Sequence, residues 1–179
     1  MNHSRMKKMI FGAVFCALTF AATWIYVPAP GVGNVNLGDG ILLLCAWMLG
    51  GPWAAVAAAL GATLADLSSG FALYAPATFV IKALMVTTAL AVHRLTARRS
   101  LRLSHILSAI AAELVMILGY FTYEFLILGL CLGIEGYGIS AILNIPFNAV
   151  QGLVGILLAV FLYEILSRAG ISPEKGFHT

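Results

Sequence analysis

The chain has 179 residues, of which 61% are hydrophobic and only 9% are charged, and its mean hydropathy is +0.99. Soluble domains carry about 25% charged residues, so this composition excludes a soluble globular protein and predicts an integral membrane protein. The net charge of +3 does not indicate nucleic-acid binding, because the basic residues lie in the short connections between apolar segments.

The apolar segments are long enough for several membrane spans. A spanning helix needs roughly 20 apolar residues, so the chain has room for about six spans in one domain covering residues 1–179. No separate soluble domain fits, and no phosphate-binding loop of the GxxxxGK type is present. We therefore expect an all-α integral membrane protein with six transmembrane helices, at residues 6–26, 39–49, 53–67, 76–96, 105–130 and 139–168.

Proline and glycine mark most of the expected helix ends. The first helix ends before Pro28, because proline and the residue before it resist helical continuation. Residues 27–38 form a loop rich in Pro, Gly and Asn, and Gly50-Gly51-Pro52 separates two short helices that we interpret as a packed helical hairpin. Pro76 opens the fourth helix, where proline is well tolerated. Residues 98–104 are expected to form a basic loop before the fifth helix.

The first helix carries small residues at every fourth position, namely Ala13, Ala17 and Ala21. This spacing predicts a smooth face that another helix can approach closely. The face serves either internal packing or docking of a partner protein.

The lysines and arginines predict the orientation in the membrane. The loops at 27–38, 68–75 and 131–138 contain none, whereas the remaining connections and the two termini carry nine: Arg5, Lys7, Lys8, Arg94, Arg98, Arg99, Arg102, Arg168 and Lys175. We therefore expect both termini on the cytoplasmic side. The expected location of the protein is the cytoplasmic membrane of the cell.

Polar side chains from separate helices fall at one membrane depth near the outer face, when depth is counted with a helix rise of about 1.5 Å per residue. They are Asp39, Asp66, Thr78, Lys82, Tyr120, Glu124, Asn144, Asn148 and Gln151. A charge in hydrocarbon costs roughly 2.5–3.5 kcal/mol, so these groups must face a cavity or one another. They form either a site for a polar organic ligand or a structural set, in which Asp39 caps a helix and Lys82 pairs with Asp39 or Asp66. Glu113 lies deeper and is either a wall of the same pocket or a locally paired carboxyl group.

Catalytic and metal-binding motifs are missing from the sequence. There is no HExxH, no GxSxG and no pair of Asp-rich motifs, and the three cysteines Cys16, Cys45 and Cys131 lack CxxC spacing. We therefore expect no enzyme activity, no metal and no cofactor.

Several motifs in the first half of the chain resemble a known family. They are Ala13-x-x-x-Ala17, Asn36-Leu-Gly-Asp39, the Gly50-Gly-Pro break, Gly61-x-x-x-x-Asp66 and Tyr74-Ala-Pro-x-Thr78-x-x-x-Lys82. Together they are similar to the substrate-binding S components of energy-coupling factor (ECF) vitamin transporters, in the riboflavin-like branch that includes hydroxymethylpyrimidine and pyridoxine types. The resemblance is specific over residues 6–94, whereas the last two helices match mainly in length and polarity.

This resemblance implies a high-affinity binding subunit that captures a vitamin or its precursor from outside. The subunit then docks on a module made of a transmembrane T subunit and two ATP-hydrolysing subunits. The resemblance makes Ala13, Ala17 and Ala21 the docking surface and residues 27–38 the loop that closes over the ligand. The expected substrate-binding residues are Asn36, Asp39, Asp66, Tyr74, Thr78, Lys82, Tyr120, Glu124, Asn144 and Asn148.

The carboxylates, amides and tyrosines favour a flat aminopyrimidine or pyridine ring, with riboflavin as a further possibility. Two other interpretations stay open at this stage. One is a self-sufficient secondary transporter in which Lys82, Glu113 and Glu124 relay protons. The other is a membrane enzyme or enzyme scaffold.

Overall fold

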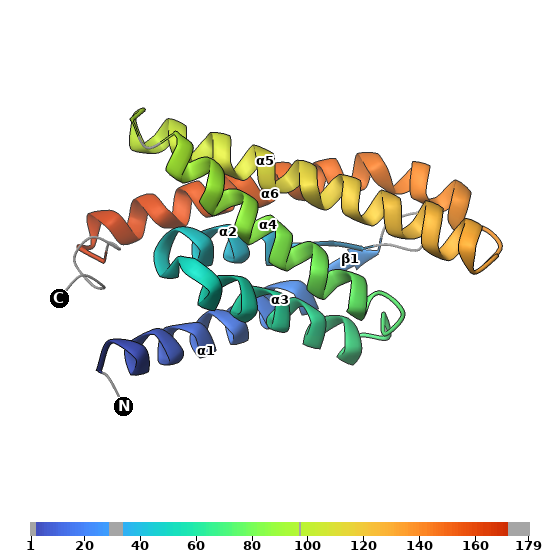
Figure 1. Ribbon diagram of the computed structural model, residues 1–179, viewed down its shortest axis with the longest axis horizontal. Coiled ribbons are helices and arrows are strands. Elements are labelled where there is room, and N and C mark those ends of the chain that lie inside the picture. Colours follow the sequence, from blue (N-terminus) through green and yellow to red (C-terminus); the bar gives the residue numbers. More distant parts are fainter. Residues whose placement is uncertain (1–2, 29–33, 97, 172–179) are drawn as a thin grey trace.

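The computed structural model describes residues 3–28, 34–96 and 98–171. Its helices are α1 (His3–Trp24), α2 (Gly38–Leu49), α3 (Gly51–Ser68), α4 (Ala75–Leu95), α5 (Leu101–Thr122), the π-helical η1 (Tyr123–Cys131) and α6 (Tyr137–Arg168). Two short strands, β1 (Tyr26–Pro28) and β2 (Asn34–Asn36), lie between α1 and α2. α1 begins and α6 ends at the same end of the bundle (Figure 1).

Four helical segments are long and apolar enough to cross a membrane: Arg5–Trp24, Ala75–Leu95, Leu101–Cys131 and Tyr137–Arg168. α2 is apolar but has only 12 residues, or about 18 Å at the usual helical rise, against a hydrocarbon core of about 30 Å. The chain is therefore a helical, multi-pass membrane protein.

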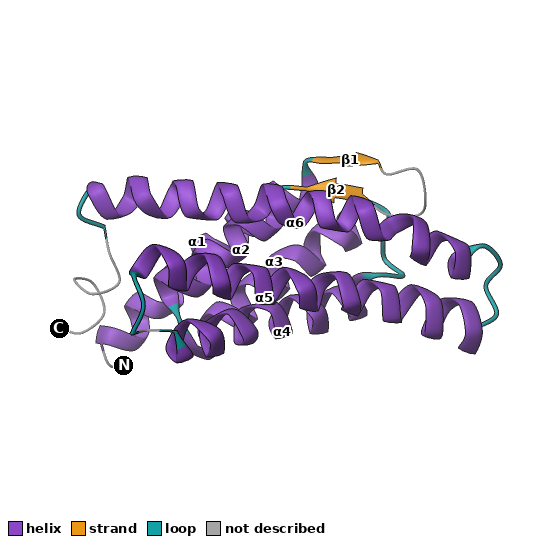
Figure 2. Ribbon diagram, turned by 90° about the horizontal axis from the view of Figure 1, so that it is seen from above, coloured by secondary structure: helices purple, strands orange, loops and turns teal. Residues whose placement is uncertain are grey.

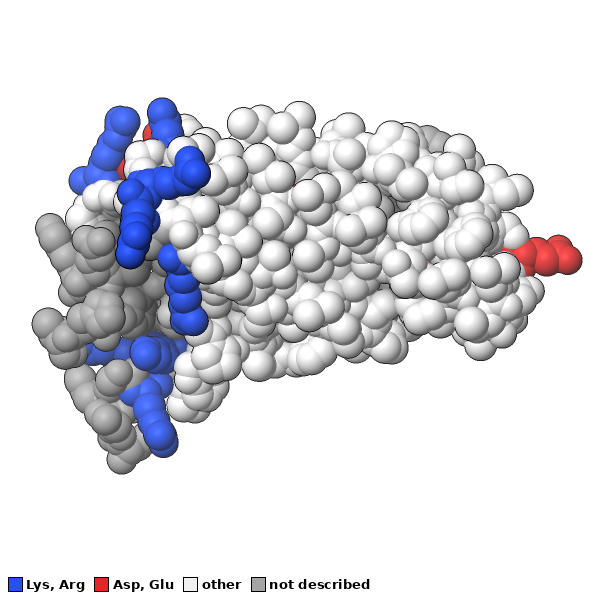
Figure 3. Space-filling model, turned by 45° about the horizontal axis from the view of Figure 1, so that its top comes forward, with Lys and Arg blue, Asp and Glu red and all other residues white. Residues whose placement is uncertain are grey.

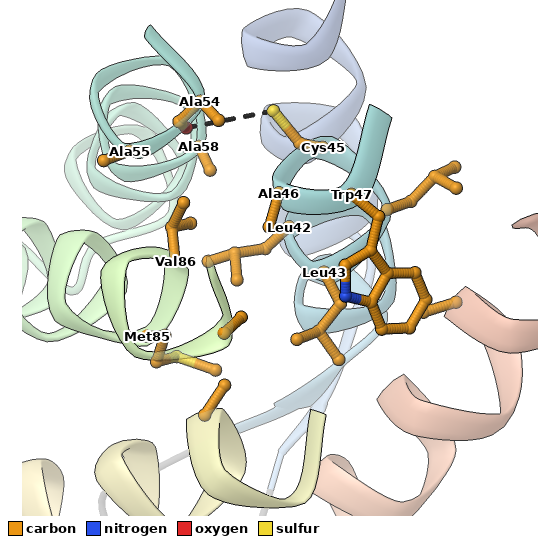
Figure 4. Close-up of a cluster of buried hydrophobic side chains, with 14 of the residues drawn as sticks. Leu42, Leu43, Cys45, Ala46, Trp47, Ala54, Ala55, Ala58, Met85 and Val86 are labelled. Atoms are coloured by element: carbon orange, nitrogen blue, oxygen red, sulfur yellow. Dashed lines mark hydrogen bonds between the residues drawn. The ribbon is translucent and has the colours of Figure 1, made fainter. Parts of the chain in front are cut away.

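α2 lies inside the bundle, where it contacts α1, α3, α4 and α6 (Figure 1). Eleven of its 12 residues are buried. Figure 4 shows Leu42 of α2 pointing toward Val86 of α4, with Ala58 of α3 nearby. Trp47 points to the other side of α2, where its ring packs against His105 of α5 and Tyr163 of α6. A helix that is apolar on every side needs such an enclosed position, so α2 forms the centre of the core.

Glycine lets α1 and α3 approach each other closely. A Cβ atom on Gly61 would clash with the backbone oxygen of Cys16 and lie 2.9 Å from the Cβ of Thr19. Only a glycine fits this crossing.

The turn from α2 to α3 depends on a different property of glycine. Gly50 and Gly51 both have φ of 64°, a conformation that side chains disfavour. Pro52 follows directly in the first turn of α3, where its missing N–H costs nothing.

The predicted loop at 27–38 is partly wrong, because it contains an antiparallel hairpin. Val27 pairs with Val35, and the flanking pairs are Tyr26 with Asn36 and Pro28 with Asn34. Figure 2 shows both strands lying together along one side of the helices. The rest of that loop, residues 29–33, falls outside the described residues.

Several helix boundaries also differ from the predictions. The first helix ends at Trp24 and not at residue 26, because the chain enters β1 at Tyr26. The basic loop predicted at 98–104 is too long. α5 already starts at Leu101, because Ser100 caps it by accepting a hydrogen bond from the backbone N of Leu103 at 3.4 Å.

The basic residues gather at one end of the molecule (Figure 3). Arg5, Lys7 and Lys8 lie in the first turns of α1, Arg94 is in the last turn of α4, and Arg168 ends α6. Lys175, which completes the predicted basic set, falls outside the described residues. The strands and the connections from α3 to α4 and from η1 to α6 carry no lysine or arginine among the described residues.

Candidate substrate-binding site

A cavity of about 470 Å³, counted out to its open mouth, lies among all the helices except α2, with β2 on one side. Twelve described residues line it: Thr23, Asn34, Asn36, Asp66, Phe71, Tyr74, Thr78, Lys82, Tyr120, Glu124, Asn148 and Gln151. Phe71 is the one member of this set without a polar side-chain atom, so the cavity offers hydrogen-bonding groups from almost every direction.

An enclosed ion pair joins the cavity lining to the residue behind it. The Lys82 ammonium bonds to one carboxylate oxygen of Asp39. Gln151 donates from Nε2 to the other oxygen at 2.6 Å, so Asp39 is held by one cation and one amide. A buried ion pair needs such additional hydrogen bonds to offset the loss of hydration.

Gln151 also holds the hairpin in place over the cavity. Its Oε1 accepts from the backbone N of Asn36 at 2.9 Å. The Asn36 side chain accepts from the backbone N of Gly38 at 2.9 Å and donates to Asn34 Oδ1 at 2.8 Å. A single amide on α6 therefore connects the hairpin, α2 and the ion pair.

A second polar cluster is built around Glu124. Its Oε1 accepts from the Tyr74 hydroxyl at 3.1 Å, and the Asn144 amide donates to both carboxylate oxygens at 3.1 and 3.0 Å. Burial, followed by the nearby charge of Glu124, raises the pKa of Tyr74 far above its usual range, so this phenol remains a donor. The Asn144 Oδ1 atom is buried, and no described residue provides it with a hydrogen bond.

Aromatic rings form the walls between these polar groups. Tyr74 has its ring centroid 6.3 Å from that of Phe71 and 6.4 Å from that of Tyr120. The Lys82 ammonium lies 5.4 Å from the centroid of Tyr120, and the Tyr120 hydroxyl is 3.1 Å from Thr78 Oγ1. Rings and dispersed polar groups together suit a flat heteroaromatic ligand.

Eight of the ten predicted substrate-binding residues line the cavity: Asn36, Asp66, Tyr74, Thr78, Lys82, Tyr120, Glu124 and Asn148. Asp39 and Asn144 lie behind it, where they hold Lys82 and Glu124. The structural alternative also holds in part, because Lys82 does pair with Asp39.

Sequence reasoning missed three lining residues, Thr23, Asn34 and Phe71. Asn34 and Phe71 lie outside helices and have no helical periodicity to place them. Gln151 was recognised as part of the polar set, but its double role with Asn36 and Asp39 depends on tertiary contacts.

Glu113 lies outside the cavity lining and is 4% exposed. Neither of its carboxyl oxygens has a hydrogen-bond partner among the described residues. Its side chain packs against Gly152 and Gly155 of α6, where an added Cβ would come within 3.1 Å of its oxygens. These two glycines make the space that Glu113 occupies.

The predicted docking residues Ala13, Ala17 and Ala21 are all exposed on one side of α1, whereas Phe15 and Thr19 between them are buried. The internal-packing alternative therefore does not account for these three alanines. Within the described ranges, no group of three or more His, Cys, Asp or Glu side chains is placed to hold a metal ion.

Comparisons with known proteins identify the family of the chain. The family model described as "ECF-type riboflavin transporter, S component" matches residues 3–168. A thiamine precursor transporter, HmpT, from Lactococcus lactis subsp. cremoris (strain MG1363), is 30% identical over 174 residues, covering 96% of this chain and 94% of the relative.

The solved structure of the S component of a bacterial ECF transporter superposes on this chain with a TM-score of 0.73 at 27% identity. The match covers 92% of this chain and 98% of the solved one. The family is one of transporter components for vitamins and their precursors and not a family of enzymes. The chain belongs to the S-component family of ECF-type transporters.

Proposed function

We propose that this chain captures a thiamine precursor of the hydroxymethylpyrimidine type on the outer side of the cell membrane. The observation that carries this proposal is the composition of the cavity, in which every described lining residue except Phe71 carries a polar side-chain atom. A small ring with polar substituents on most edges matches such a lining. Riboflavin matches it less well, because one end of its ring system is a dimethylbenzene with an apolar edge. The ancestry shared with a thiamine precursor transporter supports the same choice.

The ligand enters beside the hairpin. All six helices α1 to α6 cross or enter the bilayer as one domain, with the basic end in the cytoplasm. This orientation rests on the gathering of lysines and arginines at one end (Figure 3) and their absence from the described connections at the other. The cavity is then reached from outside.

Delivery depends on partner proteins. A T subunit and two ATPase subunits supply the energy, and the alanine face of α1 is the surface on which the T subunit docks. Exposed alanines at three successive turns let a partner helix approach closely without displacing large side chains.

Calorimetric titration of the purified protein with hydroxymethylpyrimidine, pyridoxine and riboflavin tests the choice of cargo. We expect the tightest binding for hydroxymethylpyrimidine, and preferential binding of riboflavin would refute it. Uptake by cells that express the chain with and without the ATPase module tests the need for partners. Uptake of the ligand by the purified chain alone in liposomes under a proton gradient would favour the secondary-transporter interpretation instead.

A further inference from the structure

The buried charges of the site do not balance. Four carboxyl groups, those of Asp39, Asp66, Glu113 and Glu124, are buried in this half of the molecule, and one buried ammonium group, that of Lys82, accompanies them. The other described lysines and arginines gather at the basic end (Figure 3). Within the described residues, Lys82 makes one salt bridge, and its partner is Asp39.

Asp66 is the carboxylate on the cavity wall with the weakest compensation. It is 7% exposed and forms no salt bridge among the described residues. The groups near it are the Thr78 hydroxyl, the Lys82 ammonium, which bonds to Asp39 instead, and the Tyr120 phenol. Asp66 can therefore still accept hydrogen bonds from a ligand.

Glu124 also lines the cavity, but neutral donors already hold it. Tyr74 and Asn144 supply three hydrogen bonds to its two oxygens. These contacts solvate the carboxylate without cancelling its charge. The open wall of the cavity thus presents two acidic groups and no uncommitted cation.

On this basis, and resting on the proposed function, we propose that the cargo is bound as a flat cation of the amidinium type, with Asp66 as its counter-ion. A buried carboxylate without a cation is costly, and a positively charged ligand removes that cost. Phosphorylated forms of the same ring are rejected because they add negative charge, and uncharged forms bind more weakly because they leave Asp66 unpaired.

A 4-aminopyrimidine has the required chemistry. When a ring nitrogen next to the amino-bearing carbon is protonated, its N–H and the amino N–H point the same way and donate two parallel hydrogen bonds to one carboxylate. The positive charge spreads over the ring, whose faces contact Phe71, Tyr74 and Tyr120. In alkaline solution the free pyrimidine is uncharged, so binding takes up one proton from water and places it on the ring nitrogen.

The test compares hydroxymethylpyrimidine with its 4-hydroxy analogue, which has the same shape and lacks the amino group. Both are titrated into the wild-type protein by calorimetry at alkaline pH, in buffers of different ionisation enthalpy. We expect the amino compound to bind roughly 10- to 100-fold more tightly, and to take up about one proton, whereas the 4-hydroxy analogue takes up none. The phosphate monoester of the amino compound should not bind.

The variant Asp66→Asn should abolish the preference for the amino compound, and Glu164→Gln serves as the matched control. Glu164 is a partly exposed acid paired with Arg102 at the basic end, so its substitution should change neither ligand's affinity. The wild-type proton measurement keeps the proposal testable if Asp66→Asn does not fold.

The outcomes separate this proposal from the one on which it rests. Equal affinity for the two pyrimidines, or proton uptake with both, would overturn the proposal that the cargo binds as a cation. The assignment of a pyrimidine as the cargo would stand. If the protein binds riboflavin or pyridoxine but neither pyrimidine, the assignment of the cargo is overturned. If that ligand is neutral and binds without proton uptake, the proposal of a cationic cargo is overturned as well. Failure to bind any of these ligands would overturn both.

Discussion

Asp39 on α2 and Lys82 on α4 form an ion pair whose side chains are 0% and 4% exposed. The pair connects the central helix to the wall of the cavity, and the Asp39 oxygen that Lys82 does not contact accepts from Gln151. Each charge is therefore costly to bury without the other.

Removing the cation alone should destabilise the protein strongly. Lys82→Met leaves the Asp39 carboxylate buried and unpaired, so we expect a loss of about 3–5 kcal/mol in the free energy of unfolding. The double variant Lys82→Met with Asp39→Asn should recover much of it, since neither charge remains. Thermal unfolding in detergent measures both. The exposed pair of Arg102 and Glu164 is the control, and Glu164→Gln should cost less than about 1 kcal/mol. If the stability losses of Lys82→Met and Asp39→Asn simply added in the double variant, this account of the ion pair would be contradicted.

Gly61 should tolerate no side chain. Gly61→Ala places a methyl group against the backbone of Cys16, which cannot move without displacing α1, and overpacking of this kind costs typically about 1–3 kcal/mol. Gly138→Ala is a matched control, because nothing lies within 4 Å of its added Cβ and its φ is not positive. Unfolding midpoints of the two variants decide the point, and equal midpoints would mean that the α1–α3 crossing is looser than described.

Gln151 should respond differently to two substitutions of similar size. Gln151→Met removes both hydrogen bonds of the side chain, whereas Gln151→Glu keeps an acceptor for the Asn36 backbone N but sets a carboxylate beside Asp39. Because like charges repel strongly in a buried setting, we expect Gln151→Glu to lose more stability and more ligand affinity than Gln151→Met. Calorimetry and thermal unfolding at neutral pH provide the comparison, and the reverse order would show that Gln151 does not donate to Asp39.

The exposed alanine face of α1 predicts a separation of binding from transport. Ala17→Arg should leave ligand affinity within about twofold and abolish uptake by cells that contain the ATPase module, because a long charged side chain blocks close helix contact. Ala149→Arg is the matched control, since Ala149 is also exposed but lies on α6. It should bind and transport normally. Normal uptake by Ala17→Arg would place the docking surface elsewhere.

The sequence predicted the order of the helices well, because apolar runs and the breaks at Gly50, Gly51 and Pro76 are local signals. It did not predict η1, since a change from α-helical to π-helical geometry over 123–131 has no counterpart in hydrophobic periodicity. The start of α5 was missed although Ser100 is a recognisable N-cap, because the basic residues around it were interpreted as a loop.

For the site, helical spacing and membrane depth brought together Thr78, Lys82, Tyr120 and Glu124, which do share one cavity. Spacing and depth could not distinguish the residues that line the cavity from those that support them. Asp39 and Asn144 support Lys82 and Glu124 from behind, and this depends on side-chain directions that only packing decides. Phe71 lies in a connection without periodicity, so no sequence signal pointed to it.

The hairpin beside the cavity is joined closely to α1. Ile25 is the one residue between the end of α1 and the start of β1, and the backbone N of Leu37, just past β2, donates to Ala22 of α1 at 3.3 Å. The hairpin is therefore held to α1 at both of its strands' inner ends. A tilt of α1 relative to α6 would therefore load the bond between Asn36 and Gln151, so a partner docked on α1 as proposed would act directly on the hairpin beside the cavity.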